Sequence, residues 1–427
     1  MAVSVREAER LAADLYGMSA VATSLPGEYD CNFRLRSSDG KEYVLKCMHP
    51  ARKASFLEMQ CSALEHLRIK APHLPLPRVQ RTRQATLFTE IADSAEQKRL
   101  VWMLSFLPGR TLEKTNPLSS EVLENLGWFL GELDAALGMF SHPAVHRELK
   151  WDSSRASWIG NQLHRIEDPS RRTLLEYFLS LYDQEVESRR SELRTGPIYG
   201  DANDHNVLVS APWPQPRKIA GVIDFGDMHH GWIVSEPAIA AAYALLGKDN
   251  PLGVARDIAR GFHRSFPLTE PEIATLFPLI AVRLAVSVVN SAARKEQKPD
   301  DPYVTVTENQ AWVALERLAK IHPRFAQYAL RDACGHTAVP KTEKIKIWIT
   351  QRRKQGASVV EADLRTAPLH VFDLSVGSSM LGADLGNAEI HKLTRAIFER
   401  MEREHAAIGI GRYNEARMLY HVAVRWR

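Results

Sequence analysis

The stretch IYGDANDHNVLVSAPWPQPRKIAGVIDFGD, residues 198–227, decides the fold. It places Asp201 five residues before Asn206, and the tripeptide Asp-Phe-Gly begins at Asp224, eighteen residues further on. A short apolar run follows Asn206 and another precedes Asp224, as is typical of two short strands. The order and spacing therefore predict a hairpin with three polar side chains on loops beside its strands.

Phosphoryl transfer explains why a chain would place these three residue types together. It needs metal ions that neutralise the phosphates, a residue that orients the acceptor hydroxyl, and a dry cleft. Magnesium prefers oxygen ligands and keeps several waters, so Asn206 and Asp224 suffice to hold it. Asp201 is then the carboxylate that accepts the hydroxyl proton. Taken singly, Asp and Asn are common in turns, where they bond local backbone. Their joint occurrence in this order is more specific than either motif alone.

Composition limits the class of protein. A chain of 427 residues predicts two or three structural units. Its 45% hydrophobic and 25% charged residues are typical of a globular protein, and a net charge of +4 without a basic run interleaved with aromatics gives no sign of nucleic-acid binding. Four cysteines without CxxC spacing fit a reducing compartment. The N-terminus contains acidic residues, and no apolar run of about 20 residues is evident, so we expect a cytoplasmic protein without membrane contact.

The order of predicted elements indicates an α+β architecture of two lobes. Residues 31–48 alternate as a hairpin around Asp39-Gly40, 54–70 have helical spacing, and two more strands end at Pro108-Gly109. From residue 119 onward the pattern is mainly helical, with a helix capped at Ser119 or Ser120. Further helices are predicted at 171–194, 235–247, 252–264, 271–294 and 308–332. A β-rich lobe followed by a helical lobe, with acidic residues on loops at the joint, is the expected fold.

A cation upstream completes the predicted site. Lys46 ends the strand YVLK, from where a lysine can reach the α- and β-phosphates of a nucleotide. Glu58 lies twelve residues on, in the following helix, where it could pair with Lys46 and hold it extended. Taken alone, each residue has a simpler interpretation. A lysine at the end of a strand is usually a solvated edge residue, and a glutamate on a helix usually lies on its solvated face.

Together the motifs YGDANDHN, VIDFGD and YVLK, in this lobe order, resemble the aminoglycoside phosphotransferase/choline kinase superfamily. The resemblance covers about residues 1–335 and is nearest to the branch that includes hydroxylysine kinase and type II homoserine-kinase-like proteins. It implies a protein-kinase-like fold, with Asp201 as catalytic base, Asn206 and Asp224 as magnesium ligands, and Lys46 on the phosphates of ATP.

The resemblance also implies where the nucleotide base lies. The segment LSFLPG would be the interlobe linker, whose backbone near Ser105 and Leu107 contacts adenine, and LPGEYDCNFRL resembles the nucleotide loop. The chain departs from the family in having Tyr199 where a histidine is common and in lacking a GxGxxG motif. Asp227 could bind a second metal or a substrate amine, although a turn cap is the simpler interpretation.

We predict three parts: an N-lobe at 1–107, a helical lobe at 108–335 and a C-terminal extension at 336–427. The extension resembles the segment after the kinase domain in bacterial fusion proteins, where metallopeptidase-like and class III aminotransferase-like modules come next. The resemblance implies such domains as partners in a longer chain. It also favours hydroxylysine, ethanolamine or a similar amino alcohol as acceptor.

The predicted activity is ATP- and Mg²⁺-dependent phosphorylation of the hydroxyl of a small amine-bearing alcohol or amino acid. Two alternatives stay open. An aminoglycoside phosphotransferase would need an unusually acidic acceptor cleft. A catalytically idle nucleotide-binding or scaffolding module is opposed by the presence of Asp201, Asn206, Asp224 and Lys46.

Overall fold

The computed structural model describes residues 3–27, 29–93, 96–211, 216–297, 302–338, 358–364 and 367–373. Contacts divide the chain into two compact units, Met1–Glu316 and Arg317–Arg427. In the second unit, helix α9 (Pro323–Ala333) is followed by the antiparallel hairpin of β12 (Ser358–Leu364) and β13 (Ala367–Asp373). The sequence NAEIHKLTRAIFERMEREHAAIG also predicts a helix at residues 387–409, which lies outside the described residues. The boundary predicted at 335/336 stays a prediction.

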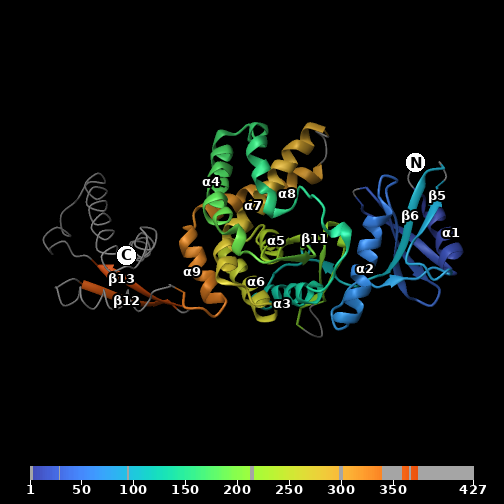
Figure 1. Ribbon diagram of the computed structural model, residues 1–427, viewed down its shortest axis with the longest axis horizontal. Helices are drawn as coiled ribbons and strands as arrows, with labels where there is room; N and C mark the ends of the chain where they lie inside the picture. Colours follow the sequence, from blue (N-terminus) through green and yellow to red (C-terminus); the bar gives the residue numbers. More distant parts are fainter. Residues whose placement is uncertain are drawn as a thin grey trace. The chain divides into compact units, whose positions relative to one another are not determined.

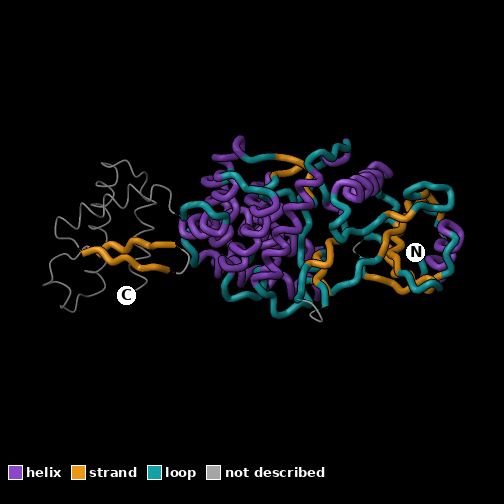
Figure 2. The backbone as a smooth tube through the Cα atoms, turned by 90° about the horizontal axis from the view of Figure 1, so that it is seen from below, coloured by secondary structure: helices purple, strands orange, loops and turns teal. Residues whose placement is uncertain are grey.

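The first unit begins with an antiparallel sheet, strand order β1-β2-β3-β6-β4, in which β5 also pairs with β6. Figures 1 and 2 show these strands grouped at the N-terminal end of the unit, ahead of the helical part. The sheet includes the predicted hairpin, and the predicted helix follows it. The elements are α1 (Val5–Tyr16), β1 (Ala20–Leu25), β2 (Cys31–Ser37), β3 (Glu42–Cys47), α2 (Ala54–Lys70), β4 (Val79–Gln80), β5 (Thr89–Ala92) and β6 (Lys98–Ser105).

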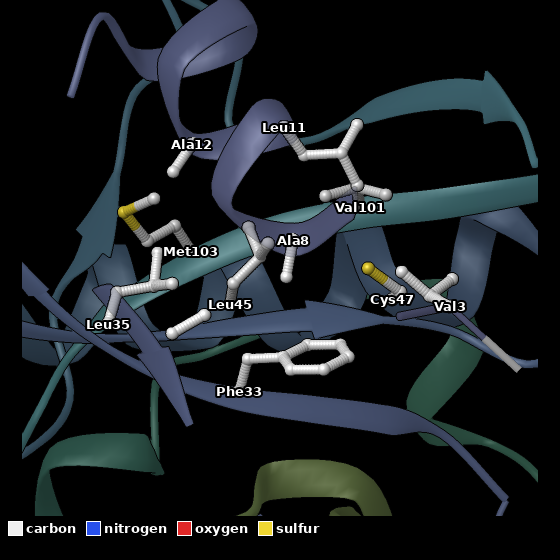
Figure 3. Close-up of a cluster of buried hydrophobic side chains, with 11 residues drawn as sticks. Val3, Ala8, Leu11, Ala12, Phe33, Leu35, Leu45, Cys47, Val101 and Met103 are labelled. Carbon is white, nitrogen blue, oxygen red and sulfur yellow. The ribbon is translucent and has the colours of Figure 1, made fainter. Parts of the chain in front are cut away.

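Strand alternation gives this sheet one apolar face, which α1 covers. Figure 3 shows Ala8 and Leu11 of α1 over side chains from β2, β3 and β6. Because side chains of a strand alternate between faces, Lys46 lies on the face opposite to its neighbours Leu45 and Cys47, which are in this core. The sheet thereby directs Lys46 away from α1. The strand residues of the core are Ala22, Phe33, Leu35, Leu45, Cys47, Val101 and Met103.

Helices make up most of the rest of the unit, and the fold is the two-lobe α+β class expected. Ser119 caps α3, since its hydroxyl accepts a hydrogen bond from the Val122 amide at 3.4 Å. The elements are α3 (Ser120–Leu137), η1 (Pro143–Val145), η2 (Ser153–Arg165), α4 (Pro169–Glu185), η3 (Glu187–Glu192), α5 (Ser235–Ala244), α6 (Pro251–Ser265), α7 (Glu270–Gln297) and α8 (Pro302–Ala319).

The prediction of one helix over 308–332 was wrong. The segment forms the end of α8 and then α9, because Pro323 lacks a backbone N–H and begins a new helix with His322 as its N-cap. The single helix predicted over 171–194 likewise ends as α4 at Glu185 and continues as the short η3.

Helix α7 is long and apolar enough to cross a membrane by length and composition alone. An 18-residue window within Glu270–Lys295 has a mean hydropathy of 1.9, and 94% of that window is buried inside the structure, as in the core helix of a globular protein. The expectation that no apolar run of about 20 residues is present was therefore wrong for α7, whose apolar pattern is interrupted in the sequence by Pro278 and Arg283.

Two small ribbons carry the quoted stretch, and they explain its spacing. Strand β8 (Thr195–Ile198) pairs with β11 (His229–Trp232), and β9 (Val207–Val209) pairs with β10 (Ile219–Val222). The chain passes from β8 to β9 through residues 199–206, here called the catalytic loop. It returns from β10 to β11 through residues 223–228, here called the second loop, which includes η4 (Phe225–Asp227).

The two loops therefore join the same two ribbons and lie side by side. The strand β7 (Arg110–Thr111) extends the second ribbon through β9. Neither β8 nor β11 was predicted, because four-residue strands that contain glycine, and in β8 also proline, carry no period-two signal.

Candidate active site

The catalytic loop holds the Asp201 carboxylate through two asparagine side chains. Asn203 donates its side-chain amide to Asp201 Oδ1 at 2.9 Å, and Asn206 donates to Oδ2 at 2.7 Å. Asn203 also accepts hydrogen bonds from the backbone amides of His205 and Asn206, which closes the loop as a tight turn. Asp201 is thereby held in one orientation, with 17% of its side chain still exposed.

Strand register brings Asn206 beside Asp224. Val207 pairs with Val222, and the amide of Ile223 donates to the carbonyl of Asn206 at 3.0 Å. Asp224 has φ of +61°, a left-handed conformation that non-glycine residues rarely adopt, and its Oδ1 accepts from the Gly226 amide at 3.0 Å. The opposite Oδ2 faces Lys46, whose Nζ lies 3.5 Å away.

This arrangement fits a divalent cation. Asn206 turns its amide nitrogen toward Asp201, which leaves its side-chain oxygen as a ligand atom, and Asp224 supplies carboxylate oxygens. Among the residues that the structure describes, no cluster of three His, Cys, Asp or Glu side chains is arranged to hold a metal. One amide and one carboxylate oxygen are, however, the kind of sparse donor set with which Mg²⁺ binds beside phosphates.

The two aspartates have opposite electrostatic environments. Burial raises the pKa of the Asp201 carboxyl well above its ordinary value, and the nearby Asp227 raises it further, while Arg283 lowers it. The Lys46 ammonium lowers the pKa of the Asp224 carboxyl. The raised basicity of Asp201 fits its predicted role as proton acceptor, and the lowered pKa of Asp224 fits its predicted role as metal ligand.

Arg283 is a site residue that the sequence analysis missed. It comes from α7, and its Nη2 lies 3.6 Å from Asp201 Oδ1. Its Nη1 donates to the carbonyl of Trp151 at 2.9 Å, and its guanidinium lies against the rings of Trp151 and Tyr243. The one signal in the sequence is a single arginine within the apolar run 276–289.

The sequence pattern also did not predict that two carboxyl groups, those of Glu236 and Asp134, lie as a pair behind the catalytic loop. Glu236 of α5 accepts the Gly200 amide at 2.7 Å, and Asp134 of α3 is wholly buried nearby. Burial raises the pKa of Glu236 to about 7 and raises that of Asp134 well above its ordinary value, to which the Glu236 charge adds. Tyr199 braces the same loop by donating its hydroxyl to the carbonyl of Ile223.

The predicted ion pair between Lys46 and Glu58 is not formed, and this part of the prediction was wrong for this structure. Lys46 faces Asp224, and Glu58 is exposed on α2. The helix phase explains the difference, because the buried side chains at Leu57 and Met59 leave position 58 on the outer side. Whether Glu58 takes part in nucleotide binding stays a prediction.

The predicted interlobe linker follows β6. The amide of Ser105 donates to the Arg78 carbonyl at 2.8 Å, and that of Phe106 to the Glu42 carbonyl at 3.0 Å. These two amides are therefore engaged within the N-lobe, and a base contact at Ser105 would have to use another group. Leu107 is half-buried, and its role stays a prediction.

Asp227 and the neighbouring histidines have structural partners. Asp227 lies 3.8 Å from Arg147 Nη2, and its carbonyl contacts His229 Nδ1 at 2.9 Å. His229 is buried and its Nε2 lies 3.8 Å from Asp152, which fits a packing role. Asp227 keeps 33% of its side chain exposed, so its carboxylate remains accessible beside Asp201.

Comparisons with known proteins show the family and the fold of the chain. Residues 21–274 match the model of the phosphotransferase enzyme family. A hydroxylysine kinase of Mus musculus is 31% identical over 315 residues, which are 69% of this chain and 83% of the mouse protein.

Two solved structures share the fold. A microcompartment-associated aminopropanol kinase has a TM-score of 0.58 at 18% identity, covering 78% of this chain and 99% of its own. An amicoumacin kinase in complex with AMP-PNP and Ca²⁺ has a TM-score of 0.55 at 14% identity, covering 73% and 92%.

Proposed function

The chain belongs to the phosphotransferase enzyme family, and we propose that it transfers the γ-phosphoryl group of ATP to the hydroxyl of a small amine-bearing alcohol or amino acid. It is a small-molecule kinase, and hydroxylysine is the first acceptor to test. The observation that carries the proposal is the Asp201 carboxylate, held by Asn203 and Asn206 beside the Asp224–Lys46 pair, in a chain with a hydroxylysine kinase as relative.

Each residue has a distinct part in the proposed reaction. The acceptor hydroxyl gives its proton to Asp201 while its oxygen bonds to the γ-phosphorus, and the bond from that phosphorus to the β,γ-bridging oxygen breaks. Lys46 contributes positive charge toward the phosphates. Asn206 and Asp224 would hold Mg²⁺, which supplies further neutralising charge when bound. The two asparagines keep Asp201 aimed, which lowers the entropic cost of the step.

The aminoglycoside alternative receives less support from the site. Such acceptors carry several positive charges and favour a cleft lined by carboxylates. Around Asp201, however, the cation Arg283 lies 3.6 Å from the carboxylate, and Asp227 is itself paired with Arg147. A mixed set of charges suits a small acceptor with charges of both signs.

The test is ATP consumption with Mg²⁺ across hydroxylysine, ethanolamine, choline, homoserine, threonine and an aminoglycoside. We expect turnover with an amino alcohol or hydroxy amino acid, and its loss in Asp201→Asn. GTP in place of ATP, and Mn²⁺ or Ca²⁺ in place of Mg²⁺, would establish the cofactor preferences. Turnover with the aminoglycoside alone would favour the alternative, and no turnover despite nucleotide binding would favour an idle module.

The proposal extends to the setting of the enzyme. The four cysteines do not pair in disulfides, which supports a reducing, cytoplasmic location. A downstream peptidase-like and aminotransferase-like module would give residues 336–427 the role of a connecting segment. Comparing the transcript's full reading frame with this chain would test that part.

A further inference from the structure

We propose that the acceptor is an α-amino acid and that Arg283 binds its carboxylate. The inference rests on the proposed kinase function and narrows its substrate class. It separates acceptors such as hydroxylysine and homoserine from simple amino alcohols such as aminopropanol, which lack the carboxylate. Arg283 is thereby a specificity-determining residue, distinct from Asp201, which accepts the proton.

Arg283 is held in one place by groups that do not neutralise its charge. The side chain is 2% exposed, its Nη1 donates to the Trp151 carbonyl, and its guanidinium lies 4.7 Å from the Trp151 ring centroid and 5.4 Å from that of Tyr243. Aromatic faces and a carbonyl orient a guanidinium, but an anion is needed to offset the cost of burying it.

No carboxylate of the described part of the chain fully meets that need. The nearest is Asp201, whose Oδ1 lies 3.6 Å from Nη2, too far for a good hydrogen bond. Both oxygens of Asp201 already accept from Asn203 and Asn206. The Nε of Arg283 is buried without any hydrogen-bond partner. A guanidinium carries five donors, and a carboxylate is the planar anion that can accept two of them together.

The position of this cation matches the chemistry of a hydroxy amino acid. An acceptor hydroxyl must reach Asp201, and a carboxylate on the same small molecule then comes within reach of the guanidinium beside it. The acceptor approaches from the side of Asp201, which is partly exposed, while Asp227 offers a partly exposed carboxylate for an ammonium group. The catalytic base thus has a cation and an anion as neighbours, complementary to a zwitterion.

The experiment compares acceptors that differ only in the carboxylate. The pairs are 5-hydroxylysine with 1,5-diaminopentan-2-ol and homoserine with 3-aminopropan-1-ol, each assayed as kcat/KM at saturating ATP and Mg²⁺. For the unmodified chain we expect the amino acid of each active pair to exceed its partner by about tenfold to a hundredfold, the range of a charge-assisted hydrogen-bonded contact. Arg283→Met should abolish this preference, and Arg283→Lys should keep part of it.

Controls separate the possible failures. Arg260→Met removes a partly exposed arginine from its ion pairs with Glu124 and Asp257 and should leave the preference intact. Equal kcat/KM within both pairs for the unmodified chain would overturn the inference while leaving the kinase. An equal loss for both members in Arg283→Lys would also overturn it and make Arg283 a brace for Asp201. No turnover of any acceptor would overturn the proposed function and the inference with it.

Discussion

The two sides of the catalytic loop place carboxyl groups in opposite environments. In front, Asp201 is partly exposed, accepts from two asparagine amides and faces Arg283, so its charge has partners. Behind Gly200, Asp134 and Glu236 are wholly buried, and three of their four oxygens make no hydrogen bond. Burial raises the pKa of all three carboxyl groups. In front, Arg283 and the Asn203 amide favour the charged form of Asp201, whereas behind the loop the Glu236 charge further opposes ionisation of Asp134.

The difference teaches how the loop can be both rigid and chemically active. Gly200 has φ of +74°, and a Cβ there would lie 3.0 Å from the His229 ring, so the loop passes close to β11 at this point. Glu236 accepts the Gly200 amide and fixes the backbone next to Asp201. The buried carboxyl group of Glu236 therefore supports the backbone that carries the proposed base Asp201.

Substitution of Asp201, in front of the loop, should have the largest effect on activity. Asp201→Asn removes the proton acceptor but keeps the size of the side chain, so we expect kcat to fall by about a hundredfold to ten-thousandfold. Nucleotide binding, measured by calorimetry with a non-hydrolysable analogue, should change little because Lys46 and Asp224 are intact. A kcat near that of the unmodified chain would contradict the assignment of Asp201 as base.

Substitution of Glu236, behind the loop, should change the free energy of unfolding and its dependence on pH. The pKa of Glu236 is raised from 4.5 to about 7 in the folded state, so its stabilising contribution is complete below pH 4.5 and is lost as the pH rises through 7. At about 1.4 kcal/mol per pKa unit, this contribution is about 3 kcal/mol. Glu236→Gln should flatten the fall of the free energy of unfolding between pH 5 and 7, measured by urea denaturation.

The control for this stability measurement is Glu121→Gln on the exposed first turn of α3, which should leave the slope unchanged. An unmodified chain whose stability is constant from pH 5 to 7 would show that the buried pair does not titrate in this range.

How much of the site the sequence could predict depends on how far apart in the sequence the contacting residues lie. Asp201, Asn206 and Asp224 belong to one hairpin, so their order and spacing are sufficient to bring them together. Arg283 reaches the site from a distant helix, and no local pattern sets that approach. Lys46 was predictable because strand alternation decides its face. Its partner Asp224 was not predictable, because it approaches Lys46 from a segment 178 residues away in the sequence.

The nucleotide side can be tested through Lys46. Lys46→Met keeps the apolar stem but removes the charge that faces Asp224, so we expect the KM for ATP to rise about tenfold, or about 1.4 kcal/mol. Lys98→Met provides the control, since Lys98 is an exposed lysine at the start of β6 and pairs with Glu90. An unchanged KM for ATP would remove Lys46 from the predicted phosphate site.

The smallest effect is expected at Glu58. In this structure it is exposed and Lys46 pairs with Asp224 instead, so Glu58→Gln should change the KM for ATP by less than about twofold, the range of exposed ion pairs. A double variant with Lys46→Met decides whether the pair forms when nucleotide is bound. If the two changes add in free energy, the residues act independently. If Glu58→Gln costs as much as Lys46→Met and the double variant costs no more, α2 must turn Glu58 inward on nucleotide binding. The exposed position would then belong to the nucleotide-free enzyme alone.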